Sequence, residues 1–145
     1  MAYLGQMALF AGLDSALLTV LADRFSHEYV VAGQLVFRQG DPGDKLYLIA
    51  RGQVEVLVHN TQGETRAIDR MDDGEHFGEM ALLQDVARNA TIRTVTDCLF
   101  LTLPKNAFLA LLKELPQVRP AVDGQIQRTL LNRARLNVPD SSPTK

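Results

Sequence analysis

Residues 72–90 read DDGEHFGEMALLQDVARNA, and this stretch is the most informative part of the chain because it interrupts a sequence that otherwise favours strands. Its middle, EMALL (79–83), is a poor strand and a good helical turn, so it predicts a short helix. Gly78 lets the backbone turn and lets a ligand come close. A helix that begins near Glu79 directs free backbone N–H groups outward, where they favour an anion.

The side chains around this helix predict the chemistry of a binding site. Ala81 leaves the approach open because its side chain is a single methyl group. Arg88, ten residues after Gly78, can return to the same point and offer a planar fork of donors to paired oxygens. Glu79 would repel an isolated phosphate, but a carboxylate accepts well from a hydroxyl. An anion beside a hydroxyl, against an apolar strand face, predicts a small phosphate ester such as a nucleotide.

Strands are predicted on both sides of this helix. From about residue 28 the pattern has a period of two, and VEVLVH (54–59) places three valines on one face. Further strands are expected at 65–71, 90–96 and 98–103. Turns that contain glycine separate these runs about every ten residues, a spacing typical of a β-sandwich, barrel or jelly roll.

Helices are predicted at both ends of the chain. The first 25 residues read as helical, with Asp14 as the N-cap of a helix over 15–24. After the strands, Pro104 suits the first turn of a helix over 105–115, which Pro116 and Pro120 end. A last helix over about 121–136 carries one stripe of side chains, formed by Val122, Ile126, Leu130 and Arg133.

Length and composition limit the function. The 145 residues predict one domain, and 46% apolar residues exclude a disordered chain. The net charge of −2 argues against nonspecific nucleic-acid binding. The charge is uneven: residues 1–103 carry 8 basic and 14 acidic side chains, and residues 104–145 carry 7 and 3. The single cysteine, Cys98, fits a reducing compartment, so we expect a cytoplasmic protein with no membrane segment in this chain.

Neither a metal site nor an enzyme is expected. The three histidines are scattered, without the spacing of metal ligands, and they stand at His27, His59 and His76. Cys98 lies in an apolar strand and is expected to be buried and inert. No nucleophile–base pair is evident, so catalysis has no candidate residues.

Three segments closely resemble the cyclic nucleotide-binding domain of catabolite-activator-type regulators, cyclic-nucleotide-dependent kinases and gated channels. They are GQLVFRQGDPGDKLYLIARGQVEV (33–56), HFGEMALLQDVARNAT (76–91) and DCLFLTLPKNAF (97–108). The resemblance covers about residues 8–136. It implies a mostly β domain over 1–136, a jelly roll (double-stranded β-helix) of about eight strands with an N-terminal helix, a short cassette helix and two C-terminal helices. The polar residues 137–145 are expected to form a flexible tail.

The resemblance also implies roles for individual residues. The phosphate would be bound by Arg88, Ala81, Leu82 and Asn89, and the ribose by Glu79 and Gly78. The base pocket would be formed by Val56, Val58, Ile68, Met80, Ala90 and Thr91. Leu82 and Phe108 match a relay from the cassette to the C-terminal helices, and Leu130 and Arg133 match a lid. Arg133 would cover the purine by a cation–π contact. Without a ligand, Glu79 and Arg88 would form only a surface ion pair.

Two residues depart from the family pattern. Ala87 stands where the family often has proline before the arginine, so the loop is expected to be less rigid. The residue after the arginine is alanine in proteins that bind cAMP and threonine where cGMP is favoured. Asn89 is neither, so cAMP is the first candidate ligand and cGMP stays open as the second.

The expected function is a sensor domain that binds a cyclic nucleotide and relays occupancy to residues 104–136, without a further cofactor. The alternative is a degenerate fold that serves as a protein-interaction module. The sensor half of a transcription regulator is a third interpretation. Only nine polar residues follow 136, too few for a helix-turn-helix, so this chain alone is not expected to bind DNA. An output domain in a larger protein, and a homodimer through 121–136, stay open.

Overall fold

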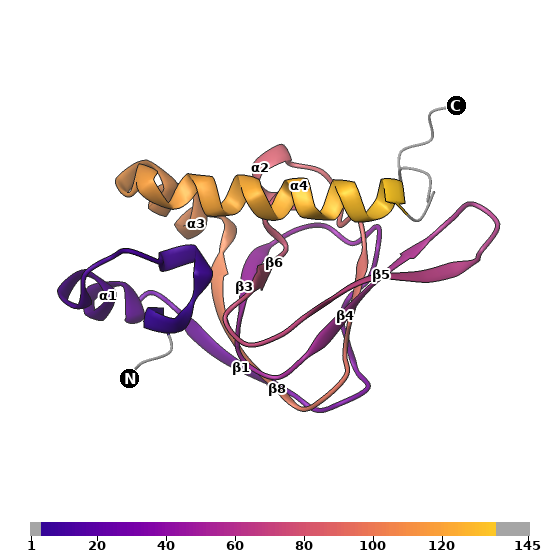
Figure 1. Cartoon of the computed structure of the whole chain (residues 1–145), viewed down its shortest axis with the longest axis horizontal. Helices are drawn as coiled ribbons and strands as arrows, with labels where there is room; N and C mark the ends of the chain where they lie inside the picture. Colours follow the sequence, from indigo (N-terminus) through magenta and orange to yellow (C-terminus); the bar gives the residue numbers. More distant parts are fainter. Residues whose placement is uncertain (1–3, 136–145) are drawn as a thin grey trace.

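The computed structural model describes residues 4–135, in which eight strands form two four-stranded antiparallel sheets (Figure 1). The strand order is β1-β8-β3-β6 in one sheet and β2-β7-β4-β5 in the other. The strands are β1 (Ser26–Val30), β2 (Leu35–Phe37), β3 (Lys45–Arg51), β4 (Val54–His59), β5 (Thr65–Met71), β6 (His76–Phe77), β7 (Thr91–Thr94) and β8 (Cys98–Pro104). This confirms the predicted mostly β jelly roll with flanking helices.

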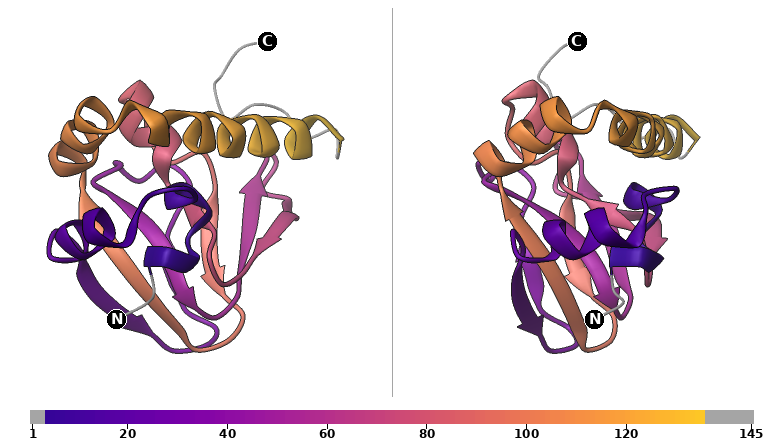
Figure 2. Two further views of the ribbon diagram at one scale, coloured as in Figure 1. Left: turned by 60° about the vertical axis from the view of Figure 1, so that its left-hand side comes forward. Right: turned by 90° about the vertical axis from the view of Figure 1, so that its left-hand side faces the viewer.

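The helices gather at one end and on one side of this roll. They are η1 (Leu4–Gln6), η2 (Ala8–Phe10), α1 (Ser15–Ala22), α2 (Glu79–Gln84), α3 (Lys105–Glu114), η3 (Pro116–Val118) and α4 (Arg119–Arg135). The long α4 lies across one end of the roll, close to α2, in all three views (Figures 1 and 2). The predicted tail 137–145 lies outside the described residues.

The continuous apolar run of β3 is explained by burial on both of its faces. Leu46 and Leu48 pack into a core that the first sheet shares with the helices. Tyr47 and Ile49 point the other way, into the core between the two sheets. Because successive side chains of a strand alternate between faces, a strand covered on both sides needs apolar residues throughout.

In β4 the three valines share one face, as the sequence predicts, although Leu57 on the other face is buried as well. Val54, Val56 and Val58 are buried in the core between the sheets. Glu55 points outward and forms an ion pair with Arg93 of the neighbouring strand β7. The valine face of β4 therefore supplies one wall of the interior of the roll.

The helix boundaries differ from the prediction in three places. Two short 3₁₀ turns replace part of the expected N-terminal helix, although Asp14 does cap α1 by accepting from the Leu17 N–H at 2.9 Å. Pro104 is the N-cap of α3, in extended conformation, rather than part of its first turn. Pro120 does not break a helix but lies at the start of α4, where a missing N–H leaves no intrahelical bond unmade.

Candidate functional site

The short helix α2 lies where the chain crosses from β6 in one sheet to β7 in the other. Gly78 precedes it with φ of 93°, a left-handed conformation that favours glycine. A Cβ at Gly78 would lie 2.8 Å from Nη1 of Arg88. Glycine is therefore required here twice, by the backbone conformation and by the closeness of the Arg88 side chain.

A second glycine brings the 39–44 loop against this helix. A Cβ on Gly43 would lie 2.5 Å from the Cβ of Ala81. The two segments can touch only because one residue has no side chain and the other has a single methyl group. The small size of Ala81, which the sequence suggested would leave room for a ligand, also permits this contact.

Arg88 is almost completely buried and holds three segments together. Its Nη1 donates to the Gly78 carbonyl at 2.9 Å, and its Nη2 donates to the Lys45 carbonyl at 2.8 Å. Asp44 is the nearest carboxylate, 3.5 Å from Nη2, on an exposed side chain. The guanidinium carbon lies 4.0 Å from the centre of the Phe37 ring, a cation–π distance. Burial lowers the pKa of Arg88, but an arginine remains charged at neutral pH.

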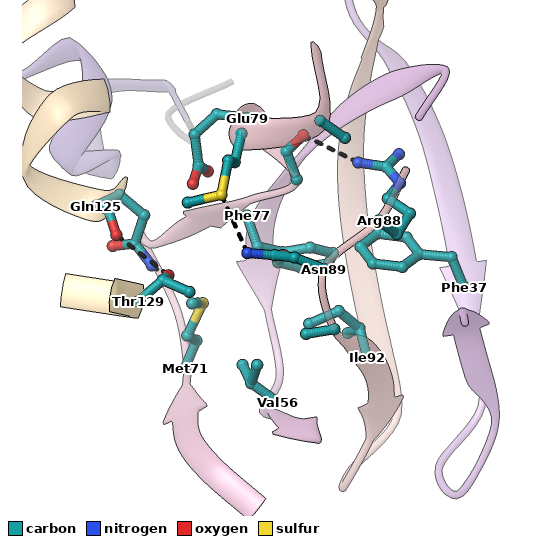
Figure 3. A pocket seen from close by; sticks show the side chains of 14 residues that line it. Phe37, Val56, Met71, Phe77, Glu79, Arg88, Asn89, Ile92, Gln125 and Thr129 are labelled. Carbon is teal, nitrogen blue, oxygen red and sulfur yellow. Dashed lines mark hydrogen bonds between the residues drawn. The ribbon is translucent and has the colours of Figure 1, made fainter. Parts of the chain in front are cut away.

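One donor of this guanidinium remains unused. The buried Nε of Arg88 has no hydrogen-bond partner within residues 4–135. A buried charged donor without a partner is costly, because its lost hydration is not replaced. Arg88 lies on the wall of a cavity (Figure 3), so an acceptor bound there could restore the missing bond.

Glu79 presents the complementary case in the same cavity. Its side chain is 3% exposed, and its Oε1 has no hydrogen-bond partner in the described part of the chain. Burial raises the pKa of Glu79 to about 7, although its own backbone N–H and the nearby Arg88 partly oppose the shift. Near neutral pH this group exchanges a proton readily, and its free oxygen could accept from a hydroxyl.

His76 is the buried neighbour of this carboxyl group. Its Nε2 lies 3.8 Å from Oε1 of Glu79, and it too has no hydrogen-bond partner among the described residues. Burial lowers the pKa of His76 to about 4, so the imidazole is neutral at pH 7. A second buried titratable group therefore lies beside Glu79, and the sequence indicated only Glu79 as part of the site.

The cavity between the roll and α4 is narrow in this structure, and Figure 3 shows the side chains that line it. Its volume is about 30 Å³, roughly the volume that one molecule takes up in liquid water. Apolar side chains from both sheets form its floor, and Gln125 and Thr129 of α4 form its roof. Gln125 also contacts the floor, through Nε2 and the sulfur of Met71 at 3.7 Å.

A larger hollow of about 580 Å³ adjoins this cavity, between the 84–89 segment and the end of α4. Met80, Arg88 and Asn89 line both spaces. The side-chain amide of Asn89 donates to the sulfur of Met80 at 3.1 Å (Figure 3). A ligand that reaches both Arg88 and Glu79 must move the roof of the inner cavity, or this Met80–Asn89 pair, or both.

The structure brings together most of the residues that the sequence singled out. The inner cavity is lined by Val56, Gly78, Glu79, Met80, Ala81, Arg88, Asn89 and Ala90. Val58 and Ile68 belong to the core between the sheets and are not on the cavity wall. The Thr91 hydroxyl faces the segment that follows β2 and accepts from the Gln39 N–H at 2.9 Å.

The predicted relay and lid residues lie on the helical side. Leu82 and Phe108 are fully buried in the same core, between the first sheet and the helices. Leu130 is half exposed at the outer hollow. Arg133 is buried, and its Nη1 donates to the Asn89 carbonyl at 2.8 Å. In this structure the Arg133 side chain is therefore bonded to the backbone at Asn89, where it joins α4 to the cassette.

Several residues of the cavity were not predicted from the sequence. They are Phe37, Met71, Phe77, Ile92, Gln125 and Thr129. The sequence could have indicated two of them. Phe77 directly precedes Gly78, and Ile92 is two residues after Ala90, on the same face of an extended strand. Gln125 and Thr129 lie beside the apolar stripe of the last helix rather than on it.

No group of three or more His, Cys, Asp or Glu side chains within residues 4–135 is placed to hold a metal ion. Among the helices of that same range, none combines the length and apolar character of a membrane span.

The sequence of this chain is similar to those of known proteins. The family model described as "Cyclic nucleotide-binding domain" matches residues 27–115. The human potassium/sodium hyperpolarization-activated cyclic nucleotide-gated channel 3 is 33% identical over 131 residues, which cover 90% of this chain and 16% of the channel. The cyclic AMP receptor protein of Thermus thermophilus is 34% identical, over 84% of this chain and 56% of that protein.

Solved structures agree with these sequence relatives. The catabolite activator protein of Thermus thermophilus superposes with a TM-score of 0.78 at 33% identity, over 89% of this chain and 60% of that one. This chain spans less than two thirds of the length of each of these relatives.

Proposed function

This chain belongs to the cyclic nucleotide-binding domain family, and we propose that it is a regulatory domain that binds a cyclic nucleotide, cAMP as the first candidate and cGMP as the second. One observation carries the proposal. Arg88 and Glu79 line the same cavity, each buried, and each has one polar atom without a hydrogen-bond partner within residues 4–135. A donor for an anion and an acceptor for a hydroxyl match a cyclic phosphate fused to a ribose.

The remaining walls suit a base. Phe37, Val56 and Ile92 give the cavity an apolar floor, and pockets for small molecules combine such walls with a few placed polar groups. Asn89 bears on the choice of base. Its amide nitrogen is engaged by Met80, which leaves its side-chain oxygen to accept from the amino group of guanine. This feature keeps cGMP as the second candidate.

Binding is proposed to act on the C-terminal helices. Because the inner cavity has the volume of about one water, a nucleotide cannot enter while Gln125 and Thr129 keep their positions. Ligand binding and the position of α4 are therefore coupled. A ligand shifts such an equilibrium only by the difference between its affinities for the two arrangements. The shared core of Leu82 and Phe108 offers a second route from α2 to α3.

Calorimetric titration of the whole chain with cAMP, and separately with cGMP, tests the proposal. Arg88→Lys keeps a positive charge but removes the fork, and we expect it to weaken binding at least ~30-fold. Arg93→Lys is the matched control, because Arg93 is partly exposed on β7 and pairs with Glu55 away from the cavity. Thermal unfolding of each variant shows that it is folded. Equal affinity of the wild-type and Arg88→Lys proteins would refute the assigned role.

The second candidate function is a protein-interaction module that binds no nucleotide. It predicts no heat and no thermal shift with either nucleotide for a wild-type protein that unfolds cooperatively. An output domain, a homodimer through α4 and a cytoplasmic location belong to the proposal as predictions. The proposal includes neither catalysis nor DNA binding by this chain.

A further inference from the structure

Arg128 joins α4 to the roll through several polar contacts. Its Nε and Nη2 donate to the two carboxylate oxygens of Asp69 at 2.8 and 2.9 Å, a bidentate fork. Its Nη1 forms a short contact with Glu75, and Nη2 also donates to the Arg70 carbonyl at 3.1 Å. Neighbouring carboxylates raise the pKa of Arg128, so the guanidinium is always charged.

The position of this contact gives it its importance. Arg128 directly precedes Thr129, one of the two roof residues of the cavity. On the other side of the cavity, Arg133 donates to the Asn89 carbonyl. The helix is thus fixed to β5 and the loop after it by Arg128, and to the cassette segment by Arg133, and Thr129 of the cavity roof lies between these two residues.

The fork with Asp69 is more than a surface ion pair. The Asp69 side chain is 14% exposed and that of Glu75 is 26% exposed, against 39% for Arg128. Fully exposed pairs contribute little to stability, whereas bidentate arginine–carboxylate pairs with restricted solvent are stronger. One cation between two carboxylates also means that removing Arg128 leaves two like charges close together.

We propose that Arg128 is an affinity-setting latch, whose contacts with Asp69 and Glu75 hold α4 closed over the cavity, so that nucleotide binds only after the latch opens. The inference rests on the proposed function for its ligand. The physical basis is that a ligand which needs a minor arrangement binds with an affinity reduced by the population of that arrangement. The latch therefore opposes binding, in contrast to Arg88, which promotes it.

The test combines ligand titration with a measurement that needs no ligand. Arg128→Met keeps the length of the side chain and removes its charge. We expect it to bind cAMP roughly five- to tenfold more tightly than the wild type, the gain that a partly exposed latch can supply. In hydrogen exchange without nucleotide, the amides of α4 should exchange faster. Arg128→Lys, with one charge and no fork, should lie between the two in both measurements.

The controls separate the latch from a general effect on the helix. Arg119→Met removes an ion pair within α4, to Asp123, that does not reach the roll, and it should leave affinity and exchange unchanged. The double variant Asp69→Asn, Glu75→Gln should reproduce Arg128→Met. Adding it to Arg128→Met should give no further gain, because both remove the same contact.

The outcomes distinguish the two proposals. If the wild type binds neither nucleotide, the proposed function fails, and the exchange of α4 amides still decides whether the latch exists. Tighter binding with faster exchange supports the latch. Weaker or unchanged binding in a folded Arg128→Met protein overturns it, because α4 would then hold the ligand rather than exclude it.

Discussion

Nε2 of His76 lies 3.8 Å from Oε1 of Glu79, and both side chains are buried with these atoms unpartnered within residues 4–135. Burial shifts their pKa values in opposite directions, to about 4 for His76 and to about 7 for Glu79. Each group is therefore neutral over part of the range in which it would be charged in the unfolded chain.

The pair predicts an unusually flat dependence of stability on pH. Because the pKa of Glu79 is raised from 4.5, its contribution is complete below pH 4.5 and is lost as the pH rises through about 7. Because the pKa of His76 is lowered from 6.5, its contribution is complete above pH 6.5 and is lost as the pH falls through about 4. Between pH 4.5 and 6.5 the two slopes oppose each other.

Removing one partner should expose the slope of the other. In Glu79→Gln, the melting temperature relative to wild type should fall more steeply as the pH drops from 6.5 to about 4, because only His76 still titrates. In His76→Gln, it should fall more steeply as the pH rises from 4.5 to about 7. Melting curves of both variants across this range decide the matter. Profiles parallel to the wild type would contradict the assigned pKa shifts.

Nucleotide binding should also depend on pH through Glu79. As the pH rises from about 6 to about 8, the carboxyl group loses its proton and becomes a better acceptor for the ribose hydroxyl. We expect cAMP to bind more tightly over this range in the wild type. The gain should vanish for 2′-deoxy-cAMP and for Glu79→Gln, both measured by calorimetry. A gain that persists with the deoxy ligand would assign the effect to another group.

Gly78→Ala should impair both folding and binding, because the new methyl group would lie 2.8 Å from Nη1 of Arg88. Gly63→Ala is a matched control: φ there is +84°, against +93° at Gly78, and nothing lies within 4 Å of the added atom. The control should lose ~1 kcal/mol of stability through its backbone alone and keep its affinity. Gly78→Ala should lose more, and bind cAMP at least ~10-fold more weakly. Equal behaviour of the two variants in melting and titration would mean that Arg88 tolerates the contact.

The ring of Phe37 should contribute to affinity through Arg88. The guanidinium lies 4.0 Å from the ring centre, so Phe37→Leu removes the π face while keeping an apolar side chain. A buried cation–π contact of this kind predicts a loss of roughly three- to tenfold in affinity. Phe37→Tyr, which keeps the π face, should bind like the wild type. If Leu and Tyr at this position bind equally well, the ring serves only to fill space.

The cassette could be predicted from the sequence because its information is local. Gly78, Glu79 and Arg88 stand within eleven residues, and the turn, the short helix and the return of the chain bring them together. The jelly roll was also predictable, since the alternating valines of 54–59 determine the faces of a strand and the regular glycine turns separate one strand from the next. The structure has eight strands, as expected.

The residues that the sequence did not reveal depend on distant packing. Phe37 approaches Arg88 only because β2 pairs with β7, a relation between segments more than fifty positions apart. Gln125 and Thr129 are polar, so the apolar stripe of α4 gave them no weight, although the helix turns them toward the cavity. Arg128 and its two carboxylates carry no local pattern, because Asp69 and Glu75 lie on β5 and in the loop that follows.

The bare backbone of Gly43 against the methyl of Ala81 makes these two positions a size-matched pair. A larger residue at either position requires a smaller one at the other. Gly43 has no side chain to lose, so only Ala81 can become smaller. Substitutions there are therefore coupled across thirty-eight positions of sequence. A spectroscopic label meant to report on the cassette has to be attached elsewhere, since even one extra carbon atom at Gly43 would push against the helix.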